Sequence, residues 1–189
     1  VDFLEKLGVS RYKVASADLV DYFLLNRVAE TKKPTLLSVG MANLGEIEEA
    51  LNIFAKYNNH NVFLLHCVSN YPCSDESLNL RAIQTLQSAF SFPVGFSDHS
   101  IGVQASVLSV AIGVKLIEKH FTLDKNLPGP DQKASSNPEE FSQLVKAVRR
   151  AEKMLGSNVK KCQEEEQQML QISRKSLFFA KSIKKDYQK

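Results

Sequence analysis

Two histidines at the ends of apolar runs are the residues of this sequence best suited to chemistry. His99 follows the run 93–96 and His120 follows the run 114–118, and the two lie 21 residues apart with a helix-like segment between them. This spacing is typical of one strand–helix–strand unit that delivers two side chains to the same end of a parallel sheet. Two imidazoles with carboxylates nearby suit a divalent transition metal. A structural, hydrogen-bonded role for each histidine is the alternative.

Other strand-like runs also end in polar residues. A lysine among several hydroxyls provides a fixed positive charge and short hydrogen-bond donors, which suits a phosphate or a carboxylate. The polar residues at these ends are Lys13, Ser16, Ser38, His66, Ser69, Ser97, Asp98 and Glu118. Lys13 could instead extend to the surface. We interpret His66 as structural and Asp98 as a residue that orients a neighbouring imidazole.

The segment 127–135 is dense in turn-forming residues and follows the fifth apolar run. A structural turn explains such a composition. Its place after a strand also puts it at the functional end of a parallel sheet, so Asp131 and Lys133 are candidate substrate contacts.

Short apolar runs alternate with stretches of helical period along most of the chain. The expected strands are 12–16, 35–39, 61–67, 93–96 and 114–118, and the expected helices are 24–29, 43–57, 80–90, 103–112 and 141–154. The alternation predicts an all-parallel α/β sheet covered by helices. Strand ends that lie 21 to 33 residues apart favour a (β/α) barrel, which normally has eight units. A Rossmann-type sheet is the alternative, but a GxGxxG motif is absent.

Composition indicates an ordinary soluble globular protein. The 189 residues are 43% hydrophobic and 24% charged, and no apolar run reaches the roughly 18 residues of a membrane span. The three cysteines form no CxxC pair and no signal peptide precedes them, so we expect a cytoplasmic location. The chain begins at Val1 without an initiator Met, and we expect it to begin inside a longer protein.

The net charge of +3 belongs to the carboxyl-terminal part of the chain. Residues 157–189 hold eight Lys/Arg and four Asp/Glu, whereas residues 1–156 hold 16 and 17. A basic tail of this kind is typical of a solvated segment, not of a nucleic-acid site. The polar segment 163–168 is expected to be a linker, and the apolar alternation of 174–180 resembles the first strand of a second domain.

Several motifs, taken in order, resemble the sialic acid synthase family. They are Gly95–Ser100, Glu118–Asp124, Pro128–Asp131, Lys13–Asp18, Leu37–Met41, Leu65–Pro72 and Asn79–Ile83. The resemblance extends over nearly the whole chain. It implies condensation of phosphoenolpyruvate with N-acetylmannosamine or a related N-acetylated amino sugar and water, which gives a nine-carbon 2-keto acid and phosphate.

The resemblance also implies an architecture. The family has a TIM barrel, a linker and a small antifreeze-like domain, and it works as a homodimer. This chain is then an incomplete barrel with strands four to eight over 1–156, a linker over 157–171, and the beginning of the antifreeze-like domain over 172–189. No nucleic-acid or membrane partner is expected.

The same resemblance assigns the site residues. It implies that His99 and His120 bind Mn²⁺ or another divalent metal. The implied substrate contacts are Lys13, Ser16, Ser38, Ser69 and Ser97 for phosphoenolpyruvate, and Tyr71 and Asp131 for the amino sugar. Asp18 and Glu118 are the implied catalytic carboxylates. The chain departs from the family pattern at Ala17, Val39 and Gln132.

Two other interpretations stay open. One is a different barrel enzyme, a metal-dependent aldolase that uses pyruvate. The other is an inactive fragment, because five of eight barrel units leave two open sheet edges. We expect residues 1–189 alone to be inactive, and the sequence leaves open whether the amino sugar is of the sialic or the legionaminic type.

Overall fold

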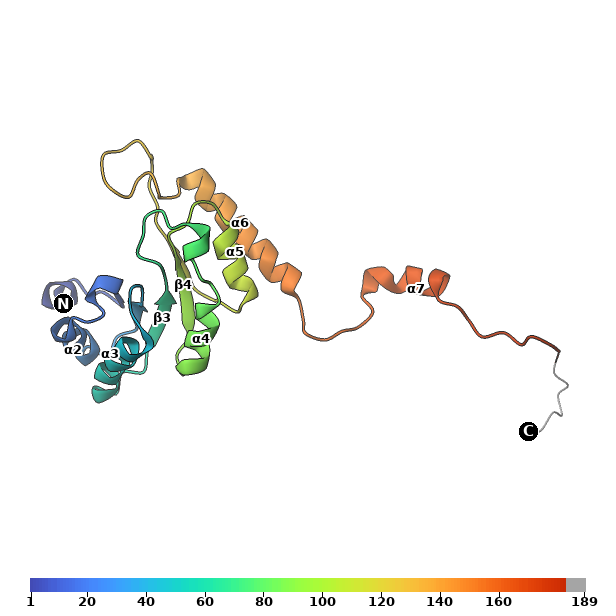
Figure 1. Ribbon diagram of the computed structural model, residues 1–189, viewed down its shortest axis with the longest axis horizontal. Helices are drawn as coiled ribbons and strands as arrows, with labels where there is room; N and C mark the ends of the chain where they lie inside the picture. Colours follow the sequence, from blue (N-terminus) through green and yellow to red (C-terminus); the bar gives the residue numbers. More distant parts are fainter. Residues whose placement is uncertain (183–189) are drawn as a thin grey trace. The chain divides into compact units, whose positions relative to one another are not determined.

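The computed structural model describes residues 1–182 (Figure 1). The chain divides into two compact units, the first at Val1–Leu155 and the second beginning at Gly156. The predicted boundaries at 156 and 171 stay predictions, because part of the expected small domain lies outside the described residues. Within 1–182, no helix combines the length and apolar character needed to cross a membrane.

The first unit is built on five parallel strands whose spatial order equals their sequence order. The strands are β1 Tyr12–Val14, β2 Thr35–Ser38, β3 Val62–His66, β4 Val94–Asp98 and β5 Ile117–Lys119. All five lie where the sequence predicts strands. The last two boundaries differ from the prediction, because pairing between β4 and β5 runs from Phe96 to Asp98 on one strand and from Ile117 to Lys119 on the other.

Helices alternate with the strands and pack on one face of the sheet (Figure 1). They are α1 Asp2–Lys6, α2 Tyr22–Glu30, α3 Leu44–Lys56, α4 Ala82–Ala89, α5 Gln104–Ala111 and α6 Pro138–Leu155, with short 3₁₀ turns η1 Ser16–Asp18 and η2 Asp75–Ser77. Helix α3 begins at a capping box: Asn43 Oδ1 accepts from the Glu46 amide at 3.1 Å, and the Glu46 carboxylate accepts from the Asn43 amide at 2.9 Å.

Alternation along the strands separates the core from a second face. The helix-covered core includes Leu37, Leu64 and Phe96, which are fully buried with Phe54 and Ile83 from the helices. Because successive strand residues point to opposite faces, the residues between them share the other face. Register places Lys13, Ser38, Leu65, Gly95, Ser97 and Glu118 on that face.

The second unit holds η3 Glu164–Glu166 and helix α7 Gln167–Ser173. The predicted strand over 174–180 is not formed: within the described residues this segment has no β-partner, and Leu177, Phe178 and Phe179 are exposed. A strand needs a neighbour for its backbone hydrogen bonds, and the described part of this unit provides none.

Candidate functional site

The sheet is so strongly curved that a side chain of its first strand contacts a side chain of its last strand. Lys13 of β1 places Nζ 3.4 Å from Glu118 Oε1 of β5. Neighbouring strands lie about 4.8 Å apart, so a flat sheet would separate β1 from β5 by roughly 19 Å. The contact therefore crosses the inside of a half-closed barrel, and the face that carries Lys13 and Glu118 is its interior.

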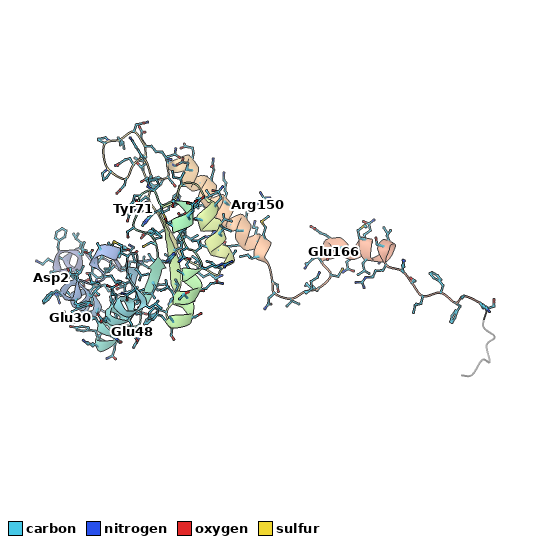
Figure 2. The ribbon with its side chains drawn as sticks, viewed as in Figure 1. Asp2, Glu30, Glu48, Tyr71, Arg150 and Glu166 are labelled. Carbon is cyan, nitrogen blue, oxygen red and sulfur yellow. The ribbon has the colours of Figure 1, made fainter. Side chains whose placement is uncertain are left out.

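The two histidines come together at the carboxyl ends of β4 and β5. Their ring centroids lie 5.3 Å apart and the rings are nearly perpendicular, at 83°. Tyr71, from the loop after β3, contacts both: its ring centroid is 4.3 Å from that of His99 and 5.2 Å from that of His120. Figure 2 labels Tyr71 at this end of the sheet.

His99 is held with one ring nitrogen free to bind a cation. Nδ1 lies 2.7 Å from the Val68 carbonyl, which can only accept, so Nδ1 carries the hydrogen. Nε2 lies 3.3 Å from Ser97 Oγ, but the Ser97 hydroxyl donates its single hydrogen to Glu118 Oε1 at 2.7 Å. Burial lowers the pKa of His99, which favours the neutral ring. Nε2 thus keeps a lone pair that no hydrogen bond within residues 1–182 uses.

His120 has a carboxylate beside it from the loop that follows β5. Its Nδ1 lies 3.8 Å from Asp131 Oδ2. The loop returns to the strand end because the Ser136 amide donates to the His120 carbonyl at 2.9 Å, and the Thr122 amide donates to the Ser136 carbonyl at 3.0 Å. The position predicted for Asp131 agrees with this geometry. Lys133 is exposed, and within residues 1–182 it makes no hydrogen bond or ion pair with these groups.

A second cluster forms at the carboxyl ends of β1–β3 from small side chains. The Gly40 amide donates to Ser16 Oγ at 3.0 Å, and Ser16 Oγ lies 3.1 Å from Cys67 Sγ. A Cβ atom on Gly40 would lie 2.6 Å from Ser69 Oγ and 2.9 Å from both Ser16 Oγ and Cys67 Sγ. Gly40 therefore contributes to the site by having no side chain, which leaves room for these three groups to come together. Its sequence signal is a glycine directly after a strand.

Ser38 and Asp18, like Lys133, join neither cluster. Ser38 is buried on the interior face, and its hydroxyl has no hydrogen-bond partner among the described residues. Asp18 lies at the end of η1, and within residues 1–182 its carboxylate makes no hydrogen bond or ion pair. The remaining candidates fall into two groups: Lys13, Tyr71, Ser97, His99, Glu118, His120 and Asp131 in the first, and Ser16 and Ser69 in the second.

Within residues 1–182 Asp98 makes no hydrogen bond to an imidazole, so the direct orienting contact expected for it is wrong. Its side chain points to the helix-covered face, because the two-residue period of a strand puts it opposite Ser97. There it accepts hydrogen bonds from Ser100 and Ser106 and pairs with Lys119. The imidazole of His99 is oriented by the Val68 carbonyl instead, and a main-chain group leaves no signal in the sequence.

His66 lies away from this interior. It is buried, its Nε2 is 2.9 Å from the Leu78 carbonyl, and its ring stacks on Phe96 with a centroid distance of 6.2 Å. Burial lowers the pKa of His66. Its place on the helix-covered face agrees with the structural interpretation.

The donor set fits a divalent metal in part. Within residues 1–182, no three His, Cys, Asp or Glu side chains gather as a complete set of ligands. The two facing imidazoles, with the Nε2 lone pair of His99 unused, are suited to bind one ion. An ion held by two protein ligands would keep open positions for water or substrate.

The part of the chain that carries both clusters decides its family. Residues 1–160 match the NeuB family. The chain belongs to this family. The resemblance to sialic acid synthases is thereby confirmed for the segment that forms the half-barrel.

Two relatives illustrate the relationship of this NeuB-family chain. It is 46% identical over 187 residues to the N,N'-diacetyllegionaminic acid synthase of Campylobacter jejuni, a match that covers 98% of this chain and 56% of the relative. It is 39% identical over 161 residues to the N-acetylneuraminate-9-phosphate synthase of Homo sapiens, which covers 85% and 45%. The chain thus spans about half the length of the curated relatives it matches.

A solved structure supports the fold. The N-acetylneuraminic acid synthetase of Leptospira borgpetersenii, crystallised with citrate, superposes with a TM-score of 0.82 at 41% identity, and the match covers 90% of this NeuB-family chain and 60% of the other. The sheet of five parallel strands in sequence order is part of a TIM barrel, as the sequence predicts.

Proposed function

We propose that this NeuB-family chain forms part of the active site of a synthase that joins phosphoenolpyruvate, an N-acetylated amino sugar and water into a nine-carbon 2-keto acid and phosphate. The observation that carries the proposal is the approach of His99 and His120 beside the Lys13–Glu118–Ser97 contacts on the barrel interior. The names of the two synthases to which the chain is similar support this chemistry.

Phosphoenolpyruvate is the substrate that the basic and hydroxyl groups suit. Lys13 provides a positive charge inside the half-barrel, and Ser16, Ser38 and Ser69 provide short donors. Ser97, whose hydroxyl donates to Glu118 in this structure, is a further proposed contact. The buried Ser38 hydroxyl has no partner in the described part of the chain, and an anionic substrate oxygen would satisfy it. Held in this way, the C3 carbon of the enolpyruvate is oriented for attack, which lowers the entropic part of the barrier.

His99 and His120 would hold Mn²⁺ or another divalent ion. When bound, the ion supplies Lewis-acid polarisation of the open-chain aldehyde of the amino sugar. Tyr71, whose ring lies against both imidazoles, is the first proposed sugar contact. Burial raises the pKa of its phenol, which keeps it a donor. Asp131, beside His120, is the second proposed sugar contact.

The proposed reaction forms a bond between C3 of phosphoenolpyruvate and the aldehyde carbon. Water adds at C2, and the C–O bond to phosphate breaks. Glu118 accepts a hydrogen bond from Ser97 and lies next to Lys13 on the barrel interior. Its proposed role is to take the proton from water and return it to the aldehyde oxygen, which becomes a hydroxyl, while the proton of the hydroxyl added at C2 leaves with the phosphate. Asp18, at the end of η1, is the second proposed catalytic carboxylate.

The complete enzyme is proposed to be a homodimer in the cytoplasm. Residues 172–189 are proposed to be the beginning of an antifreeze-like domain. Residues 1–189 alone, with two open sheet edges, are expected to give no turnover. Phosphate release by this purified chain would contradict that expectation.

A chimaeric enzyme tests the proposed activity directly. The matching segment of the Campylobacter jejuni synthase is replaced by this chain, and phosphate release from phosphoenolpyruvate is measured with N-acetylmannosamine and related N-acetylated amino sugars. We expect release that depends on the amino sugar and on Mn²⁺. His99→Ala and His120→Ala should each lower kcat at least about 1000-fold, because each removes a ligand of the ion.

His60→Ala is the matched control, since His60 is an exposed loop residue outside both clusters. It should leave phosphate release unchanged. Product formed from pyruvate without any phosphate release would favour the aldolase interpretation. Manganese-dependent release that survives both site substitutions would overturn the metal assignment.

A further inference from the structure

The two residues that directly precede the histidines in sequence form a buried ion pair on the helix-covered face of the sheet. Asp98 and Lys119 are register partners on β4 and β5, and Asp98 Oδ2 lies 3.0 Å from Lys119 Nζ. The exposed fractions of the two side chains are 0% and 3%. Each residue is followed at once by one histidine of the proposed metal site, His99 or His120.

The ion pair belongs to a hydrogen-bonded group that surrounds the main chain of His99. Asp98 accepts from the Ser100 amide at 2.9 Å, from Ser100 Oγ at 2.7 Å and from Ser106 Oγ at 2.6 Å. Lys119 donates to the Ser100 carbonyl at 2.7 Å. Since Asp98 and Ser100 flank His99, this group fixes the backbone on both sides of the imidazole.

The opposite face carries a second link between the same strands. Ser97 and Glu118 are also register partners, and the Ser97 hydroxyl donates to Glu118 at 2.7 Å on the barrel interior. The two strand ends are therefore joined on both faces at consecutive positions. Such joining matters because β5 has three residues and, among the described strands, pairs only with β4. Its short ladder by itself leaves the place of His120 weakly defined.

Stability alone is a poor reason for this arrangement. The cost of removing two charges from water can exceed their mutual attraction, and well-packed apolar residues often replace such a pair without loss. An apolar pair would make no directional hydrogen bonds. Asp98 accepts four such contacts and Lys119 donates two, and these contacts fix where each strand ends.

We propose that Asp98 and Lys119 are positioning residues that set the separation of the His99 and His120 imidazoles and so make them fit one ion. The part that concerns the ion rests on the proposed function. The part that concerns the two imidazoles rests only on the contacts above. Neither residue touches substrate; both act through the histidines that follow them.

The test uses the full chain of residues 1–189 and two readouts. The first is the nuclear Overhauser effect between ring protons of His99 and His120. The second is the Kd for Mn²⁺, measured by electron paramagnetic resonance. In Lys119→Met we expect the ring-to-ring effect to disappear and the Kd to rise at least about 10-fold, as for other residues that orient metal ligands.

Two further variants should have smaller effects on Mn²⁺ affinity, and a third serves as the control. Lys119→Arg keeps the charge and should recover part of the Mn²⁺ affinity. Ser106→Ala removes one bond to Asp98 and should raise the Kd about threefold, less than the loss of the charge. Lys33→Met is the matched control, because it removes another ion-paired lysine, the partner of Glu5, far from the histidines in sequence. It should change neither readout.

The outcomes separate this inference from the proposed function. A folded Lys119→Met chain that keeps the ring-to-ring effect and a Kd within twofold of the unmodified chain would overturn the inference. If Lys119→Met does not fold, Ser106→Ala decides by the same two readouts. If the ring-to-ring effect is lost but the unmodified chain binds no Mn²⁺, the positioning role stands and the metal part of the proposed function fails.

Discussion

The two halves of the carboxyl end of the sheet hold their side chains by different means. At β4 and β5, the histidine half, directional contacts fix His99: its Nδ1 bonds to the Val68 carbonyl, and its backbone is flanked by the Asp98–Lys119 pair. At β1–β3, the hydroxyl half, small side chains converge because Gly40 leaves room. Hydrogen bonds and an ion pair set the side-chain positions in the histidine half, whereas the space beside Gly40 sets them in the hydroxyl half. Substitutions should therefore affect the two halves differently.

Gly95→Ala in the histidine half should have the largest effect on stability. A Cβ atom on Gly95 would lie 2.7 Å from the Leu116 carbonyl oxygen and 2.7 Å from Leu65 Cδ2. The first of these is backbone and cannot rotate away, so β4 and β5 must separate. We expect the free energy of unfolding to fall by about 3 kcal/mol, measured by urea denaturation.

Gly45→Ala in helix α3 is the control, since the nearest atom to its Cβ would be the Asn43 side chain at 3.2 Å. Its effect should stay below about 1 kcal/mol, because the better helix propensity of Ala offsets the contact. Equal losses for the two variants would contradict the distinction between backbone and side-chain neighbours.

Gly40→Ala in the hydroxyl half should cost less stability and more binding. The atoms that its Cβ would meet belong to the side chains of Ser16, Cys67 and Ser69, which can rotate. We expect a loss of about 1–2 kcal/mol in the free energy of unfolding. In the chimaeric enzyme, the KM for phosphoenolpyruvate should rise about 10-fold at nearly constant kcat, because displaced hydroxyls weaken binding of substrate and transition state alike. An unchanged KM would remove the hydroxyl half from the proposed substrate site.

The fold was predictable because its signal is repeated along the chain. Each strand is a short apolar run and each helix carries an apolar stripe, so errors were confined to ends such as β5, where pairing begins at Ile117. The exception is the segment 174–180. Its alternation predicts a strand, but a strand forms only against a neighbour, and the described residues contain none for it.

The site was predictable wherever a side chain of distinctive chemistry ends a strand, as at His99 and His120. It was not predictable where the contact is made by a main-chain atom or by empty space. The Val68 carbonyl is such a main-chain atom, and the room left by the missing side chain of Gly40 is such a space. Asp98 was expected to contact a neighbouring imidazole, but the two-residue period of the strand turns its side chain to the helix-covered face, where it bonds to Ser100, Ser106 and Lys119.

Acid should distinguish the two halves by a smaller effect. Burial holds the pKa of His99 below its ordinary value of 6.5, so the unfolded chain binds a proton more readily than the folded chain. The free energy of unfolding should therefore fall as the pH drops below about 6.5, and the dependence should level off below the folded-state pKa. His66, whose pKa burial also lowers, adds to the same slope.

Urea denaturation between pH 7.5 and pH 5 measures this dependence. His99→Gln should reduce the slope without abolishing it, because one titrating ring is gone and His66 still titrates. Ser16→Ala, in the hydroxyl half, should shift the curve without changing its slope. A slope that His99→Gln leaves intact would assign the acid sensitivity to other groups.

The smallest expected effect has opposite signs in the two halves. Ser38 Oγ is buried without a partner among the described residues, so Ser38→Ala removes an unsatisfied polar atom and should raise the free energy of unfolding by up to about 1 kcal/mol. Ser97→Ala takes a donor away from Glu118 and should lower it by about 1 kcal/mol. Both variants should raise the KM for phosphoenolpyruvate in the chimaeric enzyme. A stability gain at Ser38 together with weaker substrate binding would indicate that its unpaired hydroxyl is kept for the ligand, whereas a stability loss would mean that the hydroxyl already has a partner in the folded chain.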